Sequence, residues 1–359
     1  MTPPPTNARR GLPAVRVEVD PRARLSYAWF YILGFRELLG RGNVTWSTRW
    51  RGELPPAGVH SHDQYVALVL HFGGSSRKVI VDFRDLVAFD EVAYDWSDLY
   101  CKVNLDSGDT GRPKVIPLGP GFGVGPRPHE RAPVRAVTLG ASAHLRDRRA
   151  GLGAASPSAA KLLRDVARWQ TLPDLAAYRA RPAGSDRVFY AASLWGDAAS
   201  MPSTDPERAA FMRAARASCG DGFQGGLVGG SPADRAQYPD LLLDHPIRRR
   251  DWIDQTAASA MAFNNPAVWG CLGWKLGQYL ALGKAIISTP LENVLPEPLE
   301  HGRNVHLVGS VEEIPAAIDR IRTDDDYRLE LERGALAYWH RWLAPTVVAA
   351  RILAAAESS

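Results

Sequence analysis

The chain has 359 residues, of which 45% are hydrophobic and 23% charged, and its formal net charge is +4. That length exceeds one ordinary α/β core and is sufficient for two. The composition is that of a globular protein, and the nearest approach to a membrane span, Val66 to Phe72, has only the length of a strand. No apolar segment of signal-peptide length follows the N-terminus, so we expect a cytoplasmic protein.

The basic residues are dispersed along the chain, and Arg248-Arg249-Arg250 is the only tight run. Neither aromatic-basic interleaving nor a recognisable nucleic-acid motif accompanies that run, so a nucleic-acid partner is not indicated, whereas a mild positive charge suits a protein that handles phosphorylated ligands. The three cysteines are far apart and form no CxxC pair, which indicates neither a disulfide framework nor a zinc site. The heavy use of Arg, Ala and Gly is typical of a GC-rich genome, and we expect a bacterial protein.

The first half of the chain has an α/β pattern. Leu25 to Leu39 predicts a helix with a broad apolar face. Residues 119–155 are rich in Gly, Pro and Arg and predict a loop, and a helix is expected from Ser158 to Gln170 with a short second one from Pro173 to Tyr178. Apolar runs without alternation predict strands that are buried on both faces, as in a parallel sheet: Tyr65 to Phe72, Lys78 to Phe83, Leu99 to Val103 and Lys114 to Leu118.

The Pro/Gly cluster at residues 181–184 is the predicted boundary between an N-terminal domain, 1–183, and a C-terminal domain, 184–359. The last helix, from about Tyr327 to Leu353, is long enough to break and cross back onto the first domain. Between them a second alternation of strands and helices is predicted: strand Arg187 to Ala192, helix Asp205 to Ser218, helix Trp252 to Ser259, strand Ala260 to Phe263, a helix from Trp274 followed by a strand to Ser288, strand Val305 to Val308 and helix Val311 to Ile321.

Two sets of alternating strands and helices predict the α/β class, with two Rossmann-like domains built on parallel sheets and a C-terminal helix that returns to the first domain. In such sheets ligands bind outside the carboxyl ends of the strands, here in the cleft between the domains.

Standard nucleotide and hydrolase motifs are absent, since neither GxxxxGK[ST], GxSxG nor HExxH occurs. Residues 220–225 do spell GxGxxG, but they follow a predicted helix rather than a strand, and we interpret them as a turn. The glycine cluster at 119–125 contains a proline and lacks the dinucleotide spacing, so it is also interpreted as a turn.

The most informative segment is Phe263 to Ser288, FNNPAVWGCLGWKLGQYLALGKAIIS. Gly273 precedes a helix, and the unpaired N–H groups and dipole at a helix start favour an anion. Lys275 lies in the first turn, where a cation is unfavourable unless an anion compensates, and Gln278 lies on the same face. A sugar diphosphate at the helix start with Gln278 on the ribose would explain these features, but so far an amphipathic helix with a surface lysine and glutamine explains them as well.

The stretch KLGQYLALGKAIIS resembles the K-x-x-E-Y-L-A-x-G-K-P-V-I hallmark of the C-terminal domain of GT-B glycosyltransferases, and its wider context is similar to the exostosin-like branch. Residues 299–308, LEHGRNVHLV, resemble the E-H-G-x-N-x-x-x-V stretch of the same proteins. The resemblance covers residues 186 to 325 well and the first domain weakly, through VDFRD and SDLYCKVNL.

The resemblance implies a nucleotide-sugar donor in the C-terminal domain, a small-molecule or glycan acceptor in the N-terminal one, and no metal or further cofactor. In place of the family's ribose-binding carboxylate the chain has Gln278, and in place of the proline after G-K it has Ala285. An amide can still bind two hydroxyl groups, but without the stronger charge-assisted bond. The donor-binding residues that the resemblance implies are Ser193, Trp195, Asn264, Trp269, Gly270, Gly273, Lys275, Leu276 and Gln278.

Transfer with inversion needs a general base for the acceptor hydroxyl. Asp85 directly follows a predicted strand, and His62 and Asp63, with His60, precede another, so these are the candidates. Two other functions stay open. One is another α/β transferase, such as a methyltransferase; the other is a non-catalytic nucleotide- or carbohydrate-binding protein, which Gln278 and the eleven tryptophans favour. The sequence VEVDPRARLSY lacks the glycine-rich loop that a methyltransferase should have after its first strand.

Overall fold

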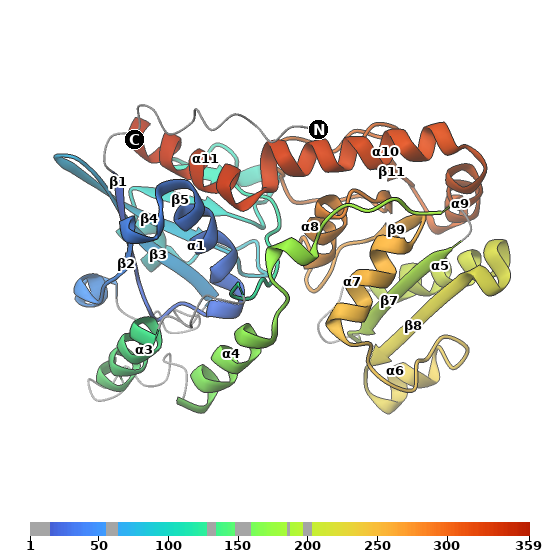
Figure 1. Ribbon diagram of the computed structural model, residues 1–359, viewed down its shortest axis with the longest axis horizontal. Helices are drawn as coiled ribbons and strands as arrows, with labels where there is room; N and C mark the ends of the chain where they lie inside the picture. The colour runs from blue at the N-terminus through green and yellow to red at the C-terminus, as the bar shows by residue number, and fades with distance from the viewer. Residues whose placement is uncertain (1–14, 55–63, 128–133, 148–158, 185–186, 197–202) are drawn as a thin grey trace.

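The computed structural model describes residues 15–54, 64–127, 134–147, 159–184, 187–196 and 203–359. Figure 1 shows two α/β domains side by side, with the C-terminal helices α10 and α11 running along one side of both. The predicted α/β class with two Rossmann-like domains is confirmed. Across the described ranges, no helix combines the length and the apolar character needed to cross a bilayer.

The first domain is built on a six-stranded sheet in the order β2-β1-β3-β4-β5-β6. The predicted helix at 25–39 is present with the same bounds, and the four predicted strands are present within three residues. Two strands that were given no bounds in the sequence analysis, β1 and β2, extend the sheet beyond β3. The elements are β1 (Val15–Val19), α1 (Leu25–Leu39), β2 (Val44–Trp46), β3 (Tyr65–Phe72), β4 (Ser75–Asp82), α2 (Glu91–Trp96), β5 (Leu99–Lys102), β6 (Val115–Pro117), α3 (Val134–Asp147) and α4 (Ala159–Thr171).

One strand departs from the predicted parallel arrangement. β3 runs antiparallel to both of its neighbours, β1 and β4, while the remaining pairs of this sheet are parallel. The reason is the two-residue link Gly73-Gly74, in which Gly73 has a φ of 61°. Two strands that are separated by two residues can only form a hairpin, and Gly-Gly supplies the positive φ that such a turn requires.

A helix was missed within the stretch predicted as loop. α3 occupies Val134–Asp147, where the glycine- and proline-rich flanks obscured a helix that includes Val137 and Leu139. Both residues pack against the main hydrophobic core. Tertiary packing therefore stabilises a segment whose own helix propensity is lowered by β-branched residues and a glycine. The short helix predicted from Pro173 is a single 3-10 turn, Leu175–Ala177.

The second domain contains two short parallel sheets, β7-β8 and β11-β10-β9. The side chain of Ser259 joins them, because its hydroxyl accepts from the N–H of Phe189 (2.9 Å) and donates to the carbonyl of Met261 (2.6 Å). The predicted elements of this half are present within a few residues. They are β7 (Val188–Leu194), α5 (Thr204–Cys219), β8 (Phe223–Gly229), α6 (Pro232–Ala236), α7 (Arg249–Ala258), β9 (Met261–Asn264), α8 (Trp274–Ala281), β10 (Ala285–Ser288), β11 (His306–Leu307), α9 (Ile314–Thr323), α10 (Asp325–Tyr338) and α11 (Pro345–Ser358).

Residues 220–225 were interpreted as a turn, but they belong to a longer glycine-rich segment that reaches Gly229. Its first part is a turn, since Gly220–Gly222 forms a 3-10 turn, but the rest is strand β8, which pairs along its whole length with β7. Glycine lowers strand propensity, so the segment looked like a loop, whereas its pairing with the apolar strand β7 determines the outcome.

The C-terminal helix breaks and crosses back onto the first domain, as predicted (Figure 1). α10 ends in a π-helical turn, and the chain restarts as α11 at Pro345, since proline cannot continue a helix. α11 packs directly on α1 at Gly34, where an added Cβ would lie 2.0 Å from the carbonyl oxygen of Pro345. The predicted domain boundary at 183/184 falls in the extended segment between α4 and β7, and its position stays a prediction.

Candidate functional site

A cavity of about 480 Å³ lies between the two domains. Its second-domain wall is formed by the carboxyl ends of β7 and β9 and by the start of α8. Its first-domain wall is formed by Tyr27, Asp85 and Arg168. Ligands of parallel α/β sheets bind at such strand ends, which makes this cavity the candidate site.

The structure brings most of the predicted site residues together at this cavity. Asp85 lines it, whereas His60, His62 and Asp63 lie outside the described residues. Trp269, Gly270 and Leu276 do not line it. The roles of all these residues stay predictions. The donor-site candidates that do line the cavity are Ser193, Trp195, Asn264, Gly273, Lys275 and Gln278.

The loop after β7 is held by an ion pair on α5. Asp205 accepts hydrogen bonds from the backbone N–H of Trp195 (3.1 Å) and of Gly196 (3.2 Å). Arg208, one turn further along α5, pairs with Asp205 and donates to the carbonyl of Ser193 (2.7 Å). The buried guanidinium of Arg208 thus reaches the end of β7 and lines the cavity, although sequence analysis did not select it.

The two asparagines at the end of β9 serve as cross-links. Asn264 donates from Nδ2 to the Ser288 hydroxyl (3.0 Å), which ties β9 to β10. Asn265 donates to the carbonyl of Thr204 (2.9 Å) and accepts from Arg208 (3.3 Å). Because buried amides need partners, these contacts fix the strand ends before any ligand arrives.

Lys275 projects from the first turn of α8 into the cavity wall. Its ammonium donates to the carbonyl of Ala191 (2.7 Å) and lies 4.5 Å from the centre of the Tyr190 ring. Burial, and secondarily the charge of Arg208, hold the pKa of Lys275 well below its usual range. An anion beside both cations would reverse this effect, because it favours the charged amine.

The start of α8 has no capping side chain, since its N-cap residue is Gly273. One turn further along the helix, Gln278 is buried and donates from Nε2 to the Tyr178 hydroxyl (3.3 Å). The amide oxygen of Gln278 can therefore accept from a ligand in the cavity.

The loop between β9 and α8 holds Trp269 in a strained conformation. Its φ is 51°, unusual for a bulky residue, and its side chain is 53% exposed. Asn293 fixes the next residue by donating to the carbonyl of Gly270 (2.7 Å). Leu276 is buried in the main core. These three predicted donor residues shape the loop and helix around the cavity rather than its lining.

Asp85 faces the cavity from the loop that follows β4. Its carboxylate accepts from the thiol of Cys271 across the domain junction, with 3.6 Å between Oδ1 and Sγ. Burial within the cleft walls raises the pKa of Asp85, and the Cys271 thiol and the charge of Arg24 oppose that rise. A raised carboxyl pKa is a property that a general base can use.

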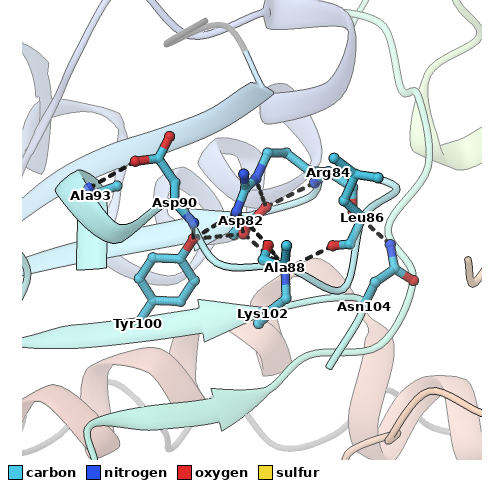
Figure 2. Close-up of polar contacts among 9 residues, drawn as sticks. All are labelled: Asp82, Arg84, Leu86, Ala88, Asp90, Ala93, Tyr100, Lys102 and Asn104. Carbon is cyan, nitrogen blue, oxygen red and sulfur yellow. Dashed lines mark hydrogen bonds and ion pairs between the residues drawn. The ribbon is translucent and has the colours of Figure 1, made fainter. Parts of the chain in front are cut away.

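A buried charge cluster lies behind the Asp85 loop (Figure 2). The carboxylate of Asp82, at the end of β4, accepts from Arg84 (2.7 Å), from the Tyr100 hydroxyl (2.6 Å) and from Lys102 (3.0 Å). All three charged side chains are fully buried. Burial alone would raise the pKa of Asp82, but Lys102 and Arg84 outweigh it and lower the pKa to about 2.

The cluster clamps the loop that carries Asp85. Lys102 donates to the carbonyl of Leu86 (2.9 Å), and Arg84 donates to the carbonyl of Ala88 (2.9 Å) (Figure 2). These charged groups bind two carbonyls that follow Asp85 in the loop, and they therefore restrict the loop backbone. The cluster therefore positions the carboxylate without contacting the cavity.

Asn104 connects this loop to the second domain. Its side chain is buried, and its Nδ2 donates to the carbonyl of Arg84 (2.7 Å) (Figure 2). Its Oδ1 accepts from the backbone N–H of Leu272 (2.8 Å), next to the N-cap residue of α8. One amide thus joins the Asp85 loop to the start of the helix that carries Lys275.

An aromatic and cationic group completes the lining. Trp274 lies edge-on to Tyr27 with 4.7 Å between ring centres. The guanidinium carbons of Arg168 and Arg249 lie 5.5 Å and 5.8 Å from the Trp274 ring centre. In the sequence, the basic run 248–250 could have pointed to Arg249. No sequence feature distinguishes Arg168 from the other arginine on its helix.

No protein-family model and no curated protein matches the chain. Similar solved structures include the C-terminal domain of a group 1 family glycosyl transferase (LpcC) from Francisella tularensis, with 12% identity over 46% of this chain and 96% of that one, at a TM-score of 0.35. HepE from Anabaena, in complex with UDP and glucose, is 14% identical over 75% of this chain and 65% of its own, at a TM-score of 0.42. A glycosyltransferase from Rickettsia africae is 11% identical over 72% and 63%, at a TM-score of 0.40.

The chain spans just under two thirds of HepE and of the Rickettsia protein. At these TM-scores the likeness carries no argument about activity, which rests on the site alone.

Proposed function

We propose that the protein is a glycosyltransferase that takes a sugar from a nucleoside-diphosphate sugar and transfers it to an acceptor in the cavity between the domains. The observation that carries this proposal is one cavity with two cations and an uncapped helix start on one wall and a carboxylate on the other. Arg208, Lys275 and Gly273 lie on the second-domain wall, and Asp85 lies on the first-domain wall. A diphosphate needs the former, and a nucleophilic hydroxyl needs the latter.

In the proposed reaction the acceptor hydroxyl attacks the anomeric carbon of the donor sugar while Asp85 takes the hydroxyl proton. The bond from the anomeric carbon to the diphosphate oxygen breaks, and the nucleoside diphosphate leaves with that electron pair. Lys275, Arg208 and the dipole of α8 stabilise the charge on the leaving group. The oxygen of Gln278 accepts from a ribose hydroxyl, and neither a metal nor a further cofactor takes part.

Binding and turnover test the proposal in two steps. Calorimetric titration with UDP, GDP and ADP should show micromolar to millimolar binding of at least one of them, with no heat from S-adenosylmethionine. The matching UDP-, GDP- or ADP-sugar should then be hydrolysed slowly in the absence of acceptor. Binding without hydrolysis would support a non-catalytic binding protein instead, and binding of S-adenosylmethionine alone would support a methyltransferase.

The role of Asp85 is tested by Asp85→Asn. Loss of a general base lowers turnover by about a hundredfold or more, while binding of the nucleoside diphosphate stays unchanged. Asp95→Asn is the matched control, because Asp95 is exposed on α2 and does not line the cavity. If Asp85→Asn turns over donor at the wild-type rate, Asp85 is not the base.

A further inference from the structure

Two guanidinium groups from different domains lie at one aromatic ring of the cavity wall. Arg168 comes from α4 of the first domain, and Arg249 comes from the first turn of α7 in the second. Each guanidinium carbon lies within 5.8 Å of the ring centre of Trp274. Both side chains also line the cavity, so an anion bound beside this ring lies near two positive charges.

Among the described residues, neither of these guanidinium groups has a carboxylate partner. Asp165, one turn before Arg168, pairs with Arg24 (3.3 Å), and Asp205 pairs with Arg208 (3.2 Å). Like charges held at one ring in a partly enclosed cavity repel each other, and a ligand anion removes that repulsion. The charged residues of the lining are four cations and one carboxylate: Arg168, Arg208, Arg249, Lys275 and Asp85.

The arginine pair is separate from the cations assigned to the donor diphosphate. Trp274 and Lys275 are consecutive on α8, so their side chains leave the helix roughly 100° apart. The ammonium of Lys275 lies 4.5 Å from the ring of Tyr190 in the second domain. The Trp274 ring instead lies 4.7 Å from Tyr27 in the first domain. A diphosphate at Lys275 and Arg208 carries about one charge on each phosphate, which matches those two cations and leaves the pair at Trp274 unmatched.

We propose that Arg168 and Arg249 form a second anion subsite, which binds a phosphate or carboxylate group of the acceptor. This inference rests on the proposed glycosyl transfer and specifies its acceptor as an anionic sugar or glycan. Guanidinium groups bind both of these anions through paired hydrogen bonds. A sugar ring has an apolar face that stacks on aromatic side chains, and Tyr27 and Trp274 offer such rings beside the pair.

The first domain connects this subsite to the candidate base. Arg168 lies 5.5 Å from the ring centre of Tyr27 as well, and the Tyr27 ring stacks on Phe83, two residues before Asp85. The charge of Arg24, which lies over the same Tyr27 ring, acts on the pKa of Asp85. An acceptor whose anion is held by the arginines therefore lies beside the loop of the carboxylate that would activate its hydroxyl.

Three small probes that differ in one group test the subsite: glucose, glucose 6-phosphate and glucuronate. Each is titrated by calorimetry into the full chain that is already saturated with UDP or whichever nucleoside diphosphate binds. We expect at least one of the two anionic probes to bind about tenfold more tightly than glucose, the ratio that one charge-assisted hydrogen bond supplies. The two anionic arms distinguish a phosphate from a carboxylate.

Variants with matched controls assign the effect to the pair. Arg168→Gln and Arg249→Gln should each abolish the preference for the anionic probe, and Arg168→Lys, which keeps the charge but not the planar fork, should retain part of it. Arg164→Gln and Arg250→Gln are the controls, because these arginines lie on the same helices outside the cavity lining. Since Arg249 also lies beside the Tyr178 hydroxyl that holds Gln278, Arg168 is the decisive position.

The outcomes separate this inference from the proposed function. Binding of the nucleoside diphosphate to the Arg168→Gln variant should stay within about twofold of wild type. If that binding is instead lost, Arg168 belongs to the donor site and the inference is wrong, although glycosyl transfer stands. If neither anionic probe binds more tightly than glucose, the inference is also wrong. If no nucleoside diphosphate binds the wild type, it is the proposed function that fails.

Discussion

The two walls of the cavity are built in different ways. The second-domain wall comes largely from one continuous segment, in which β9, a strained loop and α8 follow one another between residues 261 and 281. The first-domain wall comes from Tyr27, Asp85 and Arg168, which are far apart in the chain and sit on a helix start, a loop and a helix end. The first-domain wall is held by a buried charge cluster, and the second-domain wall by backbone geometry and amide cross-links.

This difference explains why one wall could be recognised in the sequence and the other could not. A site made by one segment keeps its spacing in the sequence, so its motif can be recognised. A site assembled from distant elements has no spacing, and its residues are fixed by groups that never touch the ligand. The Asp82 cluster is such a group, because it sets the Asp85 loop from behind.

Breaking the charge cluster should have the largest effect. Asp82→Asn leaves Arg84 and Lys102 buried without their counter-charge, and removal of one partner of a buried pair lowers the free energy of unfolding by about 3–5 kcal/mol. Urea denaturation at neutral pH measures it. Asp240→Asn breaks the half-exposed pair with Arg213 and should change stability by less than about 1 kcal/mol. Equal effects from the two variants would show that the cluster is not a structural centre.

The same carboxylate predicts an acid dependence. The pKa of Asp82 is lowered from 3.8 to about 2, so its contribution to stability is fully present above the unfolded value and is lost as the pH falls through the folded one. Between those values the Asp82→Asn variant should show a shallower loss of stability with acid than the wild type. Unfolding free energies measured from pH 5 down to the lowest pH that still allows reversible unfolding check this, and parallel curves would contradict it.

Removing the Lys275 amine from the second-domain wall should weaken ligand binding rather than destabilise the fold. Lys275→Met is expected to weaken nucleoside diphosphate binding by about 1–3 kcal/mol, the range for a lost charged hydrogen bond. Because burial holds the pKa of Lys275 low in the empty protein, the variant should be no less stable. Lys284→Met is the matched control, since Lys284 is also buried and bonded to a backbone carbonyl but lies outside the cavity.

The Lys275 amine also sets the sign of two pH profiles. In the empty protein its pKa lies below the unfolded value, so stability rises with pH from the folded pKa up to the unfolded one. Diphosphate binding needs the charged amine, so affinity should fall as the pH rises from the pKa of the empty protein to the higher pKa of the complex. Calorimetry across the neutral and alkaline range tests this, and an affinity that rises with pH would exclude Lys275 from the diphosphate site.

Asn104 tests whether the two walls act together. Asn104→Ala leaves the carbonyl of Arg84 and the N–H of Leu272 without a partner, which should lower the free energy of unfolding by about 1–2 kcal/mol. Donor turnover should fall by about tenfold while nucleoside diphosphate affinity changes little, since the walls lose their alignment but keep their groups. Asn43→Ala, at an exposed helix end, is the control. An unchanged kcat would mean that Asn104 is only structural.

Much of the fold could be predicted because local patterns and tertiary packing agree in most elements. Helix α1 and the β9–α8–β10 unit have clear apolar runs with glycine or polar ends. The failures occurred where a distant partner overrides composition: α3 is stabilised by packing, and β8 by pairing with β7. The direction of β3 was predictable from Gly73-Gly74, but the non-alternating strands suggested a parallel sheet instead.

For the site, the same reasoning selected Lys275 and Gln278 from one helix face but gave no means to select Arg208. That residue faces the cavity because Asp205 and Asn265 fix its guanidinium, and those contacts exist only in the folded chain. Arg168 depends likewise on the packing of α4 against α1, where Asp165 accepts from the N–H of Ser26 (3.3 Å). The Asp82 cluster could not be assigned because it needs the register of β4 against β5.

The smallest expected effect concerns Gln278, where the chain departs from the family pattern. Its Nε2 already donates to the Tyr178 hydroxyl, so its oxygen is left to accept from one ribose hydroxyl. Gln278→Ala removes one neutral hydrogen bond and should raise the KM for the donor by roughly two- to tenfold, with kcat little changed. Gln170→Ala, exposed on α4 outside the cavity lining, is the matched control.

Gln278→Glu distinguishes an adapted site from a degraded one. A carboxylate cannot donate to the Tyr178 hydroxyl, so that hydroxyl would have to donate to it instead. The carboxylate would also add a negative charge near the diphosphate, so the nucleotide-sugar substrate would gain little binding energy. We therefore expect the glutamate variant to be no more active than the wild type in donor hydrolysis. A large gain in activity would mean that the cavity was built for a carboxylate and that the wild-type glutamine weakens it. If neither variant alters donor kinetics, the face of α8 that carries Gln278 does not contact the nucleotide, and the donor must bind nearer to the end of β7, where Arg208 and Ser193 lie.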